Sequence, residues 1–446
     1  MKNRQILVIG NNVSAKIFFE ENLPNICSLN TVFQIKKYSE GRVNNEILPE
    51  EMRRVISRRR FLEYVAFGTG LLAWPLSIKA EDKHYLIVGA GIVGTAIAYA
   101  LQQAGEKVTL IDKDFPAAHA SGKTFAWINA TYPKQSFNYH LLSRLGINVY
   151  QRWDAHLKLK INWKGSLEWF KNNDENQNML KKVEVIQGFG SKAEIISKEE
   201  ALEYEPNILL NQNFITRSPR DGVINPVQAI KKMILGIQSK GGKVIFPTEF
   251  LGVAANKEGV TAKTTHGLIR ADKIVYACGT GSNLVAQGKY LKPSTPGLIV
   301  TTKPFKQTIN KILIGPDVHV YQRRDGVVIL GEQGKPPTNH DQRLSQRPEK
   351  FPNQPVSIEH GQRIVNLAVN FIPQFKDLII EKVEIGWRPL PLDGKPVIGF
   401  LNKYEYLATM HSGISLAPIV AELARDELMF DVISELLNYF RPQGLL

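Results

Sequence analysis

The sequence is poor in cysteine. Only Cys27 and Cys278 occur among 446 residues, without a Cys-x-x-Cys pair and without the histidine and cysteine spacing that zinc sites require. Loss of an N-terminal leader would remove Cys27 and with it any internal disulfide. We therefore expect no zinc module and a fold that depends on a hydrophobic core, which a chain of this length can bury.

Long hydrophobic runs are also missing. The uncharged stretch at 64–78 is 15 residues long and contains two glycines and a proline, so it is too short for an ordinary membrane-spanning helix. The sequence has no internal repeat and no low-complexity tract. Hydrophobic residues make up 43% and charged residues 22%, as in an ordinary soluble globular protein with two or three domains.

Acidic residues are outnumbered by basic ones. The formal net charge is +14, and residues 1–80 supply +5 of it, from 12 Lys/Arg against 7 Asp/Glu. Elsewhere the basic residues are scattered, in pairs such as Lys181-Lys182 and Arg323-Arg324. This scatter predicts at most a weak association with an anionic surface, such as that of a membrane, and it disfavours a nucleic-acid partner.

A candidate export signal stands before the uncharged stretch. The run SRRRFL at 57–62 resembles the twin-arginine export motif, and Ala80 could mark a cleavage point. That pathway carries folded proteins already loaded with cofactor. We therefore expect residues 52–80 to be a signal segment and the protein to be periplasmic or membrane-associated. The alternative is a cytoplasmic protein in which this segment is buried or lies along the surface.

Residues 1–51 form an extension of unknown role. They contain a candidate strand at 5–10, but no glycine pattern follows it. Translation from Met52, which Arg53 and Arg54 follow, would give the export leader an ordinary length.

A dinucleotide-binding pattern begins at Tyr85. The apolar run at 85–88 predicts a strand buried on both faces, and the glycines Gly89, Gly91 and Gly94 follow it. They permit a tight turn, a close approach of pyrophosphate to the backbone, and close packing of the next helix on the strand. We expect that helix at 95–104, with its N-terminus facing the phosphates.

A second strand at 108–111 ends on Asp112, which can accept hydrogen bonds from an adenosine ribose. An irregular loop then follows, whereas a nicotinamide-binding domain would continue with another helix and strand. The sheet resumes with a helix near 226–240 and strands at 243–246 and 273–277. The nucleotide-binding domain is therefore expected to be interrupted by inserted material.

The chain resembles the D-amino-acid oxidase superfamily of FAD-dependent oxidoreductases, which includes glycine and sarcosine oxidases and D-amino-acid dehydrogenases. The resemblance covers about residues 82–430. The segments that carry it recur in the same order: GAGIVG at 89–94, Ala120-Ser121-Gly122, DGVINP at 221–226, Ala277-Cys278-Gly279, WRPLPLDGKPVIG at 387–399 and His411-Ser412-Gly413.

The resemblance implies an α/β plus α+β fold. A Rossmann-like FAD-binding domain would comprise residues 81–130, 216–290 and 376–446. The inserted substrate domain would comprise 131–215 and 291–375 and be built on a mostly antiparallel sheet, in agreement with the short β-rich runs there. The loop-like segment 333–355 is a candidate lid over the pocket between this sheet and the flavin.

The family's chemistry is hydride transfer from a carbon that bears an amine to the flavin of FAD, followed by hydrolysis of the imine. This chemistry needs no acid–base pair or triad, and the sequence shows none. The expected partners are a small-molecule amine or amino acid as substrate, and oxygen or a membrane quinone as electron acceptor.

Three residues are implied for the substrate site. Arg388 matches the family's carboxylate-binding arginine, since a guanidinium can hold a carboxylate with two hydrogen bonds; the alternative is a surface ion pair with an acid such as Glu384. His319 and Tyr321 would share one face of a strand. The related oxidases tend to have tyrosine where His319 falls, which argues against a simple amino acid as the substrate. His319 could bond the substrate or be a packed strand residue.

The remaining implied residues surround the flavin. Ser121 and Gly279 belong to the matching segments. The backbone N–H groups of Gly413 and Ile414 would begin a helix at the flavin's pyrimidine edge, where its positive end stabilises negative charge. Lys123 could reach the flavin ring or be an exposed lysine.

Two other activities remain open at this point. The first is a 2-hydroxy-acid or polyol-phosphate oxidoreductase of the same superfamily, which would release no ammonia or free amine. The second is a tRNA-modifying FAD oxidoreductase, which the basic charge permits and an export leader opposes. A flavin-binding protein without turnover is the non-enzymatic alternative.

Overall fold

The computed structural model describes residues 6–9, 16–19, 83–130, 136–256, 259–294, 296–332 and 354–442. The chain divides into two compact units, one of Met1–Glu81 with Val432–Asn438 and one of Asp82–Asp431 with Tyr439–Leu446. In the first, β1 (Ile6–Ile9) pairs antiparallel with β2 (Lys16–Phe19), so the candidate strand near the N-terminus is present. The candidate export signal and its cleavage point lie outside the described residues.

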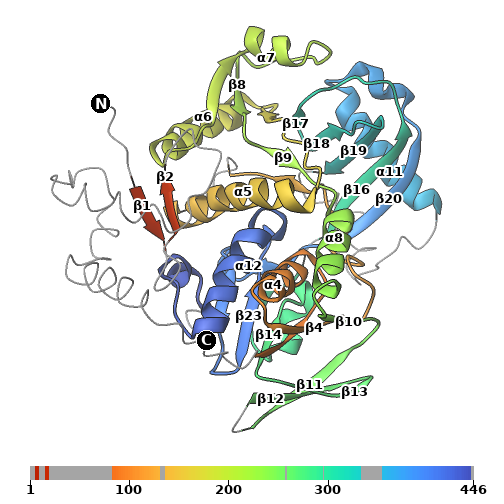
Figure 1. Cartoon of the computed structure of the whole chain (residues 1–446). Helices are drawn as coiled ribbons and strands as arrows, with labels where there is room; N and C mark the ends of the chain where they lie inside the picture. Colours follow the sequence, from red (N-terminus) through yellow and green to blue (C-terminus); the bar gives the residue numbers. More distant parts are fainter. Residues whose placement is uncertain are drawn as a thin grey trace, which may run out of the picture. The chain divides into compact units, whose positions relative to one another are not determined.

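A six-stranded sheet forms the half of the second unit that contains the predicted nucleotide-binding turn (Figure 1). Five of its strands are parallel, and β22 is antiparallel to β23. The apolar runs found in the sequence supply its centre and are buried on both faces, as parallel sheets require. The order across the sheet is β10 (Lys243–Ile245), β4 (Lys107–Ile111), β3 (His84–Val88), β14 (Lys273–Tyr276), β23 (Glu405–Thr409) and β22 (Val397–Phe400).

Four helices pack together beside this sheet: α4 (Ile92–Gln103), α5 (Phe137–Leu157), α8 (Pro226–Gln238) and α12 (Gly413–Phe430). Small residues allow the backbones to approach closely. A Cβ added to Gly146 of α5 would lie 2.3 Å from the carbonyl oxygen of Ser415 in α12. The start of α8 is fixed by proline at its first position and by Asn225, whose side chain accepts from the N–H of Gln228.

An eight-stranded sheet forms the other half of the unit. All its pairs are antiparallel except β17 with β6, which are parallel. The order is β20 (Ile380–Trp387), β16 (Pro296–Pro304), β19 (Val327–Glu332), β18 (Val318–Gln322), β17 (Ile312–Gly315), β6 (Ser166–Glu168), β8 (Phe214–Ser218) and β7 (Glu194–Ser197).

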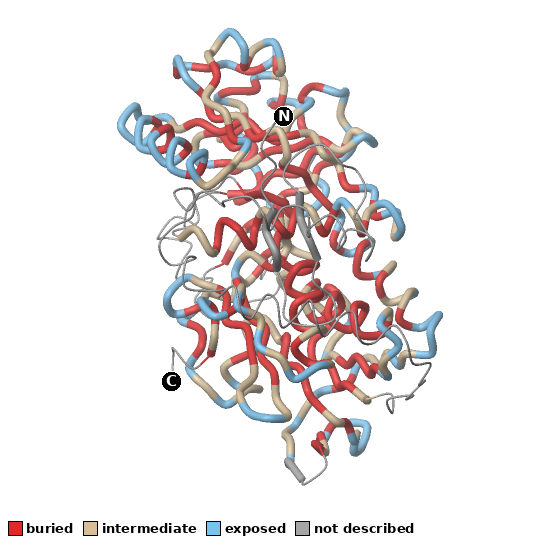
Figure 2. Tube along the Cα trace, turned by 60° about the vertical axis from the view of Figure 1, so that its left-hand side comes forward, coloured by how far each residue is buried: buried red, intermediate tan, exposed pale blue. Residues whose placement is uncertain are grey.

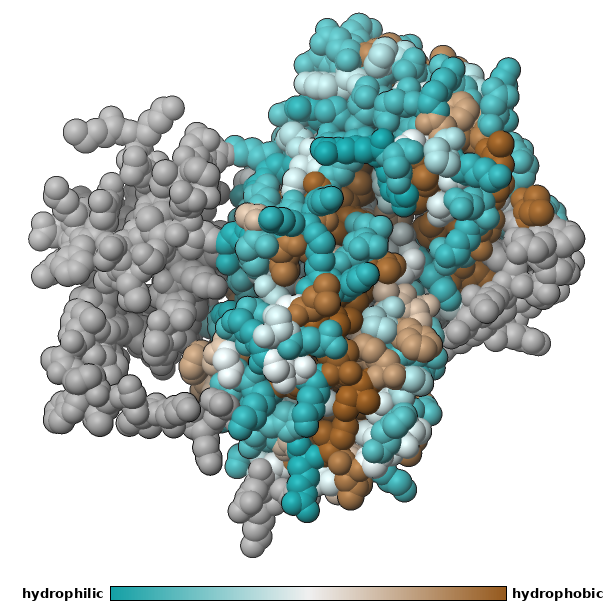
Figure 3. Space-filling view, turned by 45° about the vertical axis from the view of Figure 1, so that its right-hand side comes forward, coloured by the Kyte–Doolittle hydropathy of each residue, from teal (hydrophilic) through white to brown (hydrophobic). Residues whose placement is uncertain are grey.

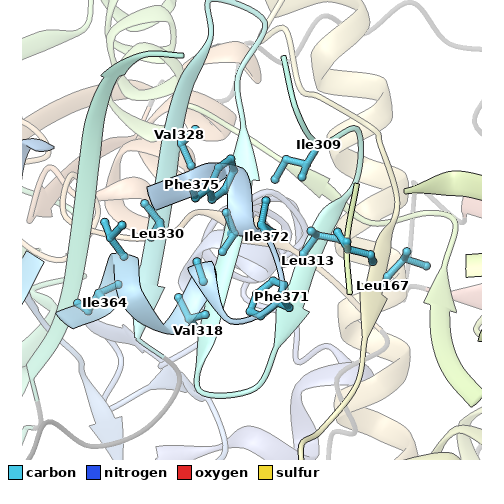
Figure 4. Close-up of a cluster of buried hydrophobic side chains, with 14 of the residues drawn as sticks. Leu167, Ile309, Leu313, Val318, Val328, Leu330, Ile364, Phe371, Ile372 and Phe375 are labelled. Atoms are coloured by element: carbon cyan, nitrogen blue, oxygen red, sulfur yellow. The ribbon is translucent and has the colours of Figure 1, made fainter. Parts of the chain in front are cut away.

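The two faces of this sheet bury different clusters. One face packs against α11 (Gln354–Val369) and the 3₁₀ turn Pro373–Asp377, and Figure 4 shows Val318, Leu330 and Phe375 among its side chains. Burial of each such side chain stabilises the fold by roughly 1.5–3 kcal/mol. The opposite face gathers His319, Tyr321 and apolar residues around the Phe125–Trp127 segment. In Figure 2 buried positions run through the interior, and exposed ones collect along outer turns and helices.

Smaller elements complete the unit. Their bounds are β5 (Trp127–Ile128) paired with β9 (Gly222–Val223), β15 (Leu291–Lys292) paired with β21 (Leu390–Pro391), the sheet of β11 (Phe250–Asn256), β12 (Gly259–Thr264) and β13 (Gly267–Ala271), the helices α6 (Asn173–Gly188), α7 (Lys198–Tyr204) and α9 (Ser282–Val285), and 3₁₀ turns at Gly279–Gly281 and, in part belonging to the first unit, Glu435–Phe440.

The predicted strands and helices of both sheets are confirmed, with one shift. The helix after the glycines begins at Ile92, three residues earlier than predicted, because Gly91 already serves as its N-cap. The candidate lid lies outside the described residues up to position 353, and its last two residues begin α11.

Candidate active site

The turn after β3 is shaped by contacts that leave no room for a side chain. Gly89 has φ +111°, and a Cβ there would lie 2.4 Å from the carbonyl oxygen of Ala277 at the end of β14. A Cβ on Gly94 would lie 2.0 Å from the carbonyl oxygen of Gly89. The glycines therefore hold β3, α4 and β14 at distances that only hydrogen permits.

The N-terminus of α4 is built to meet an anion. Its N-cap, Gly91, makes no side-chain cap bond, and a Cβ there would meet only Ser121 Oγ, at 3.1 Å. Ser121 Oγ instead accepts from the N–H of Ile92 at 3.0 Å. The predicted serine thus lies at the helix end, where unpaired N–H groups and the helix dipole favour phosphate.

Asp112 follows β4 beside this turn. Its Oδ2 accepts from the N–H of Ala90 at 2.6 Å, and its Oδ1 accepts from the N–H of Asp114 at 3.0 Å. Burial raises the pKa of Asp112, and the two N–H bonds oppose that shift. Each carboxylate oxygen accepts more than one bond, so Asp112 can also accept from ribose hydroxyls. The turn, the helix end and this acid fit the adenosine and pyrophosphate parts of FAD.

The start of α12 lies against the start of α4. A Cβ on Gly413 would lie 3.2 Å from Val93 Cγ2, and Tyr150 donates its hydroxyl to the carbonyl oxygen of Ile414 at 2.6 Å. Ser415 Oγ accepts from the N–H of Asn129 at 3.1 Å and donates to the carbonyl oxygen of Trp127 at 3.4 Å. Two helix N-termini and the loop that precedes Trp127 therefore meet at one place.

Lys123 and Gly279, the other two predicted flavin-site residues, lie on separate elements. The loop with Lys123 passes so close to β20 that a Cβ on Gly386 would lie 2.2 Å from the Lys123 carbonyl oxygen. Gly279 has φ +54° at the 3₁₀ turn after β14. Its neighbour Cys278 donates its thiol to the carbonyl oxygen of Val88, and burial raises the thiol pKa to about 12, so it is a poor nucleophile.

His319 and Tyr321 lie on the face of β18 that looks away from α11. Phe125 packs against both, with ring centroids 5.3 Å from His319 and 5.0 Å from Tyr321. The indole of Trp127 lies 6.0 Å from the imidazole. We call Phe125, Trp127, His319 and Tyr321 the aromatic wall; within it Trp127 and His319 are half-buried and the other two are buried.

The imidazole of His319 is held neutral. Burial, aided by the positive charge of Arg388, lowers the pKa of His319 to about 3. Its Nδ1 is buried and has no hydrogen-bond partner in the described part of the chain. A buried polar atom without a partner costs stability, which is the pattern of a group that awaits a ligand.

Arg388 lies just beyond the end of β20, and its guanidinium covers Gly297 of β16, 3.0 Å from the position of an added Cβ. Burial lowers the pKa of this half-buried arginine, and the charge of Glu332 opposes that shift. Glu332 itself is held by both terminal nitrogens of Arg363, at 2.6 and 2.8 Å. Glu384, the alternative partner considered from the sequence, pairs with Lys382 at 2.7 Å. Among the described residues no carboxylate lies within ion-pair distance of Arg388.

Sequence reasoning missed the acids behind the aromatic wall. Asp221 belongs to the motif at 221–226, yet it is 1% exposed and accepts from Trp127 Nε1 at 2.9 Å. Glu168 belongs to no motif. It is 2% exposed, lies on β6 in the same row of the sheet as His319, and burial raises its pKa to about 8. An acid within a short strand between apolar residues was the available signal.

No group of residues suited to a metal ion occurs in the part of the chain that the structure describes. The same described residues contain no helix of the length and apolarity needed to cross a bilayer. On the face drawn in Figure 3, hydrophilic side chains predominate and apolar ones gather in bands between them.

The six-stranded sheet with its glycine turn is of the Rossmann type. One face of the eight-stranded sheet meets the segment Phe125–Trp127, and this combination defines an FAD-binding α/β protein. The family model for FAD dependent oxidoreductases matches residues 84–427, and the chain belongs to this family, the D-amino-acid oxidase superfamily. Its cofactor is FAD, and the family is one of oxidoreductases, as the resemblance in the sequence implied.

Curated relatives are distant. The chain is 26% identical to a bifunctional protein ThiO/ThiG of Trichormus variabilis over 380 residues, which are 80% of this chain and 54% of the relative. It therefore spans about half the length of the ThiO/ThiG proteins it matches. It is 22% identical to a glycine oxidase of Bacillus licheniformis, over 80% of this chain and 96% of the relative.

Solved structures share the fold. Glycine oxidase from Geobacillus kaustophilus superimposes with a TM-score of 0.71 at 18% identity, over 80% of this chain and 98% of that one. L-amino acid deaminase from Proteus vulgaris gives 0.65 at 18% identity, over 78% and 94%.

Proposed function

We propose that this protein oxidises an amino acid, or another amine that carries a carboxylate, with FAD as the electron acceptor in the site. The observation that carries the proposal is Arg388, a half-buried guanidinium without a carboxylate partner among the described residues, beside the unpartnered Nδ1 of His319. A charge that is partly desolvated and unpaired is costly unless a ligand pairs with it.

The site residues divide the work of binding and orientation. Arg388 would take the substrate carboxylate in two parallel hydrogen bonds, which fixes the direction of the α-carbon. The neutral imidazole of His319 would hydrogen-bond the amine or the carboxylate without adding a second positive charge. Bound FAD supplies a two-electron acceptor for the hydride of the C–H bond beside the amine.

The names of relatives support an amine donor. Glycine oxidase is named for oxidation of an amino acid and L-amino acid deaminase for removal of the amine from one, and both share the fold. His319 replaces the tyrosine expected at its position, which supports a substrate other than glycine itself. A glycerol 3-phosphate oxidase of Mycoplasma pneumoniae matches a shorter part of the chain, so alcohols belong in any substrate test.

The electron acceptor and the cellular location are part of the same proposal. Export through the twin-arginine route would deliver a folded, FAD-loaded protein to the periplasm, where a membrane quinone is available. The basic charge supports contact with an anionic membrane surface. Arg58 and Arg59 are the residues to change to lysine, with retention in the cytoplasm as the expected result.

The test is anaerobic reduction of the bound flavin by a panel of D- and L-amino acids, N-substituted amino acids, simple amines and 2-hydroxy acids. Bleaching by an amino acid, with release of ammonia or a free amine, is the expected result. Bleaching by hydroxy acids alone would replace the proposal with the alcohol-oxidising alternative. The same amino acid offered as its amide should bleach far more slowly, because Arg388 then has no carboxylate to bind.

A further inference from the structure

Trp127 occupies a junction between the two halves of the site. Its backbone carbonyl accepts from Ser415 at the start of α12, and its strand β5 pairs with β9. Its indole lies against His319 of the aromatic wall, 6.0 Å between ring centroids. The backbone of Trp127 is thus bonded to helix α12, and its half-buried side chain lies beside His319.

The orientation of the indole is fixed from behind. Trp127 has a single N–H donor, Nε1, and it donates to Asp221 Oδ2 at 2.9 Å. The same oxygen accepts from Ser166 Oγ at 2.7 Å. Because Asp221 is 1% exposed, water cannot readily replace these bonds, and a bond to a buried carboxylate is about twice as strong as one between neutral groups.

A second acid supports this arrangement without adding charge. Glu168 lies on the same face of β6 as Ser166, two positions along. Burial, together with the negative charge of Asp221, raises the pKa of Glu168 to about 8, so it keeps its proton at neutral pH. A neutral Glu168 does not repel a carboxylate at Asp221, which accepts the hydrogen bonds from Trp127 and Ser166.

Resting on the proposed function, we propose that Trp127 determines which substrate side chains the pocket accepts, and that Asp221 is the positioning residue that holds its indole. With the carboxylate at Arg388, the substrate's side chain meets the aromatic wall, whose exposed rings are the indole and the imidazole. The indole then limits the size of the side chain that the substrate can carry.

The measurement is a selectivity ratio, kcat/KM for an amino acid with a phenylmethyl side chain divided by kcat/KM for its methyl counterpart of the same chirality. Trp127→Ala should raise this ratio about 10-fold or more, since the opened wall admits the larger group. Asp221→Leu should raise it in the same direction, and Asp221→Asn, which keeps an oxygen acceptor, should raise it less.

Two variants separate positioning from a general structural role. Ser166→Ala removes the other hydrogen bond to the same carboxylate oxygen and should leave the ratio unchanged. Trp127→Phe keeps one aromatic ring but removes the N–H donor together with part of the indole's volume, so it should raise the ratio at least as much as Asp221→Leu. It also serves if the leucine variant does not fold. In Trp127→Phe, adding Asp221→Asn should give no further rise, because the bond is already absent.

An unchanged ratio in Trp127→Ala would refute the role of Trp127, and an equal rise in Ser166→Ala would refute the role of Asp221. These outcomes differ from failure of the proposed function. If the proposed function is wrong, the unmodified protein will oxidise no amino acid, and the inference about Trp127 will then be wrong too.

Discussion

The glycine turn and the aromatic wall are two parts of one site that are packed in different ways. Backbone atoms determine the residues of the turn, whereas side chains determine those of the wall. In the turn, the positions of Gly89 and Gly94 are set by backbone atoms that would lie 2.4 and 2.0 Å from an added Cβ. In the wall, rings from β5, β18 and the preceding loop touch one another and acids lie behind them. At Gly89 and Gly94 only glycine fits. In the wall, other side chains can replace the present ones, and such substitutions would change which ligand binds.

The largest expected effect is in the turn. Gly94→Ala would force a methyl group into the Gly89 carbonyl, so either the turn or α4 must move, and the phosphate site moves with it. We expect the purified variant to retain less than about a tenth of the FAD, measured as flavin absorbance per protein, with a lower melting temperature.

Gly105→Ala, at the other end of α4, is the matched control. Gly105 has a positive φ, of +99°, which Gly94 lacks, and nothing lies within 4 Å of its added Cβ. It should cost only about 1 kcal/mol of stability and keep its flavin. Equal flavin loss in both variants would mean that a general loss of stability, and not the close approach at Gly94, governs binding.

The same contrast explains what the sequence could predict. A close backbone approach demands glycine at fixed spacing, so Gly89, Gly91, Gly94 and Asp112 identify the nucleotide turn without any partner being known. Elements with a clear apolar period, such as β18 and α8, were predictable for the same local reason.

The wall depends on partners that are distant in the chain. Trp127 and Asp221 are 94 positions apart, and nothing local marks them as a pair. Arg388 has two acids that could have paired with it, Glu332 and Glu384. Arg363 binds the first and Lys382 binds the second, so neither forms an ion pair with Arg388. Such choices are settled by tertiary packing, which residue types and spacing do not encode.

Arg388→Ala should give the next largest effect, this time in the wall's part of the site. Loss of a charge-assisted pair of hydrogen bonds is worth about 1.5–3 kcal/mol, which corresponds to a rise of roughly 10- to 150-fold in the KM for a carboxylate substrate. Flavin content should not change, in contrast to Gly94→Ala. Arg388→Lys should recover part of the binding as a point charge. A KM that stays the same would remove Arg388 from the substrate site.

Glu168 gives a third prediction, about stability. Its folded pKa, about 8, lies above the ordinary value of 4.5, so the folded state holds a proton that the unfolded state releases. The stabilisation is complete below about pH 4.5 and is lost as pH rises toward 8. Glu168→Gln, which cannot ionise, should therefore gain on the order of 3 kcal/mol relative to the unmodified protein between pH 5 and pH 8.

Chemical denaturation at several pH values measures this difference, and Glu199→Gln on exposed α7 is the control that should follow the unmodified protein. Parallel curves for Glu168→Gln and the unmodified protein would show that the buried acid stays ionised, and that Asp221 is then not the sole charge behind Trp127.

His319, in the same row of the sheet, should respond with the opposite sign and the smallest effect. Its folded pKa, about 3, lies below the ordinary 6.5, so the unfolded state binds the extra proton. The corresponding stability is complete above about pH 6.5 and is lost as pH falls toward 3. His319→Gln should therefore lose less stability than the unmodified protein between pH 7 and pH 5, by on the order of 1 kcal/mol, since the imidazole is half-buried.

His156→Gln, at an exposed position of α5, is the control. If His319→Gln and the unmodified protein weaken equally on acidification, the imidazole is reached by water in the free protein, and the wall is open before any substrate arrives.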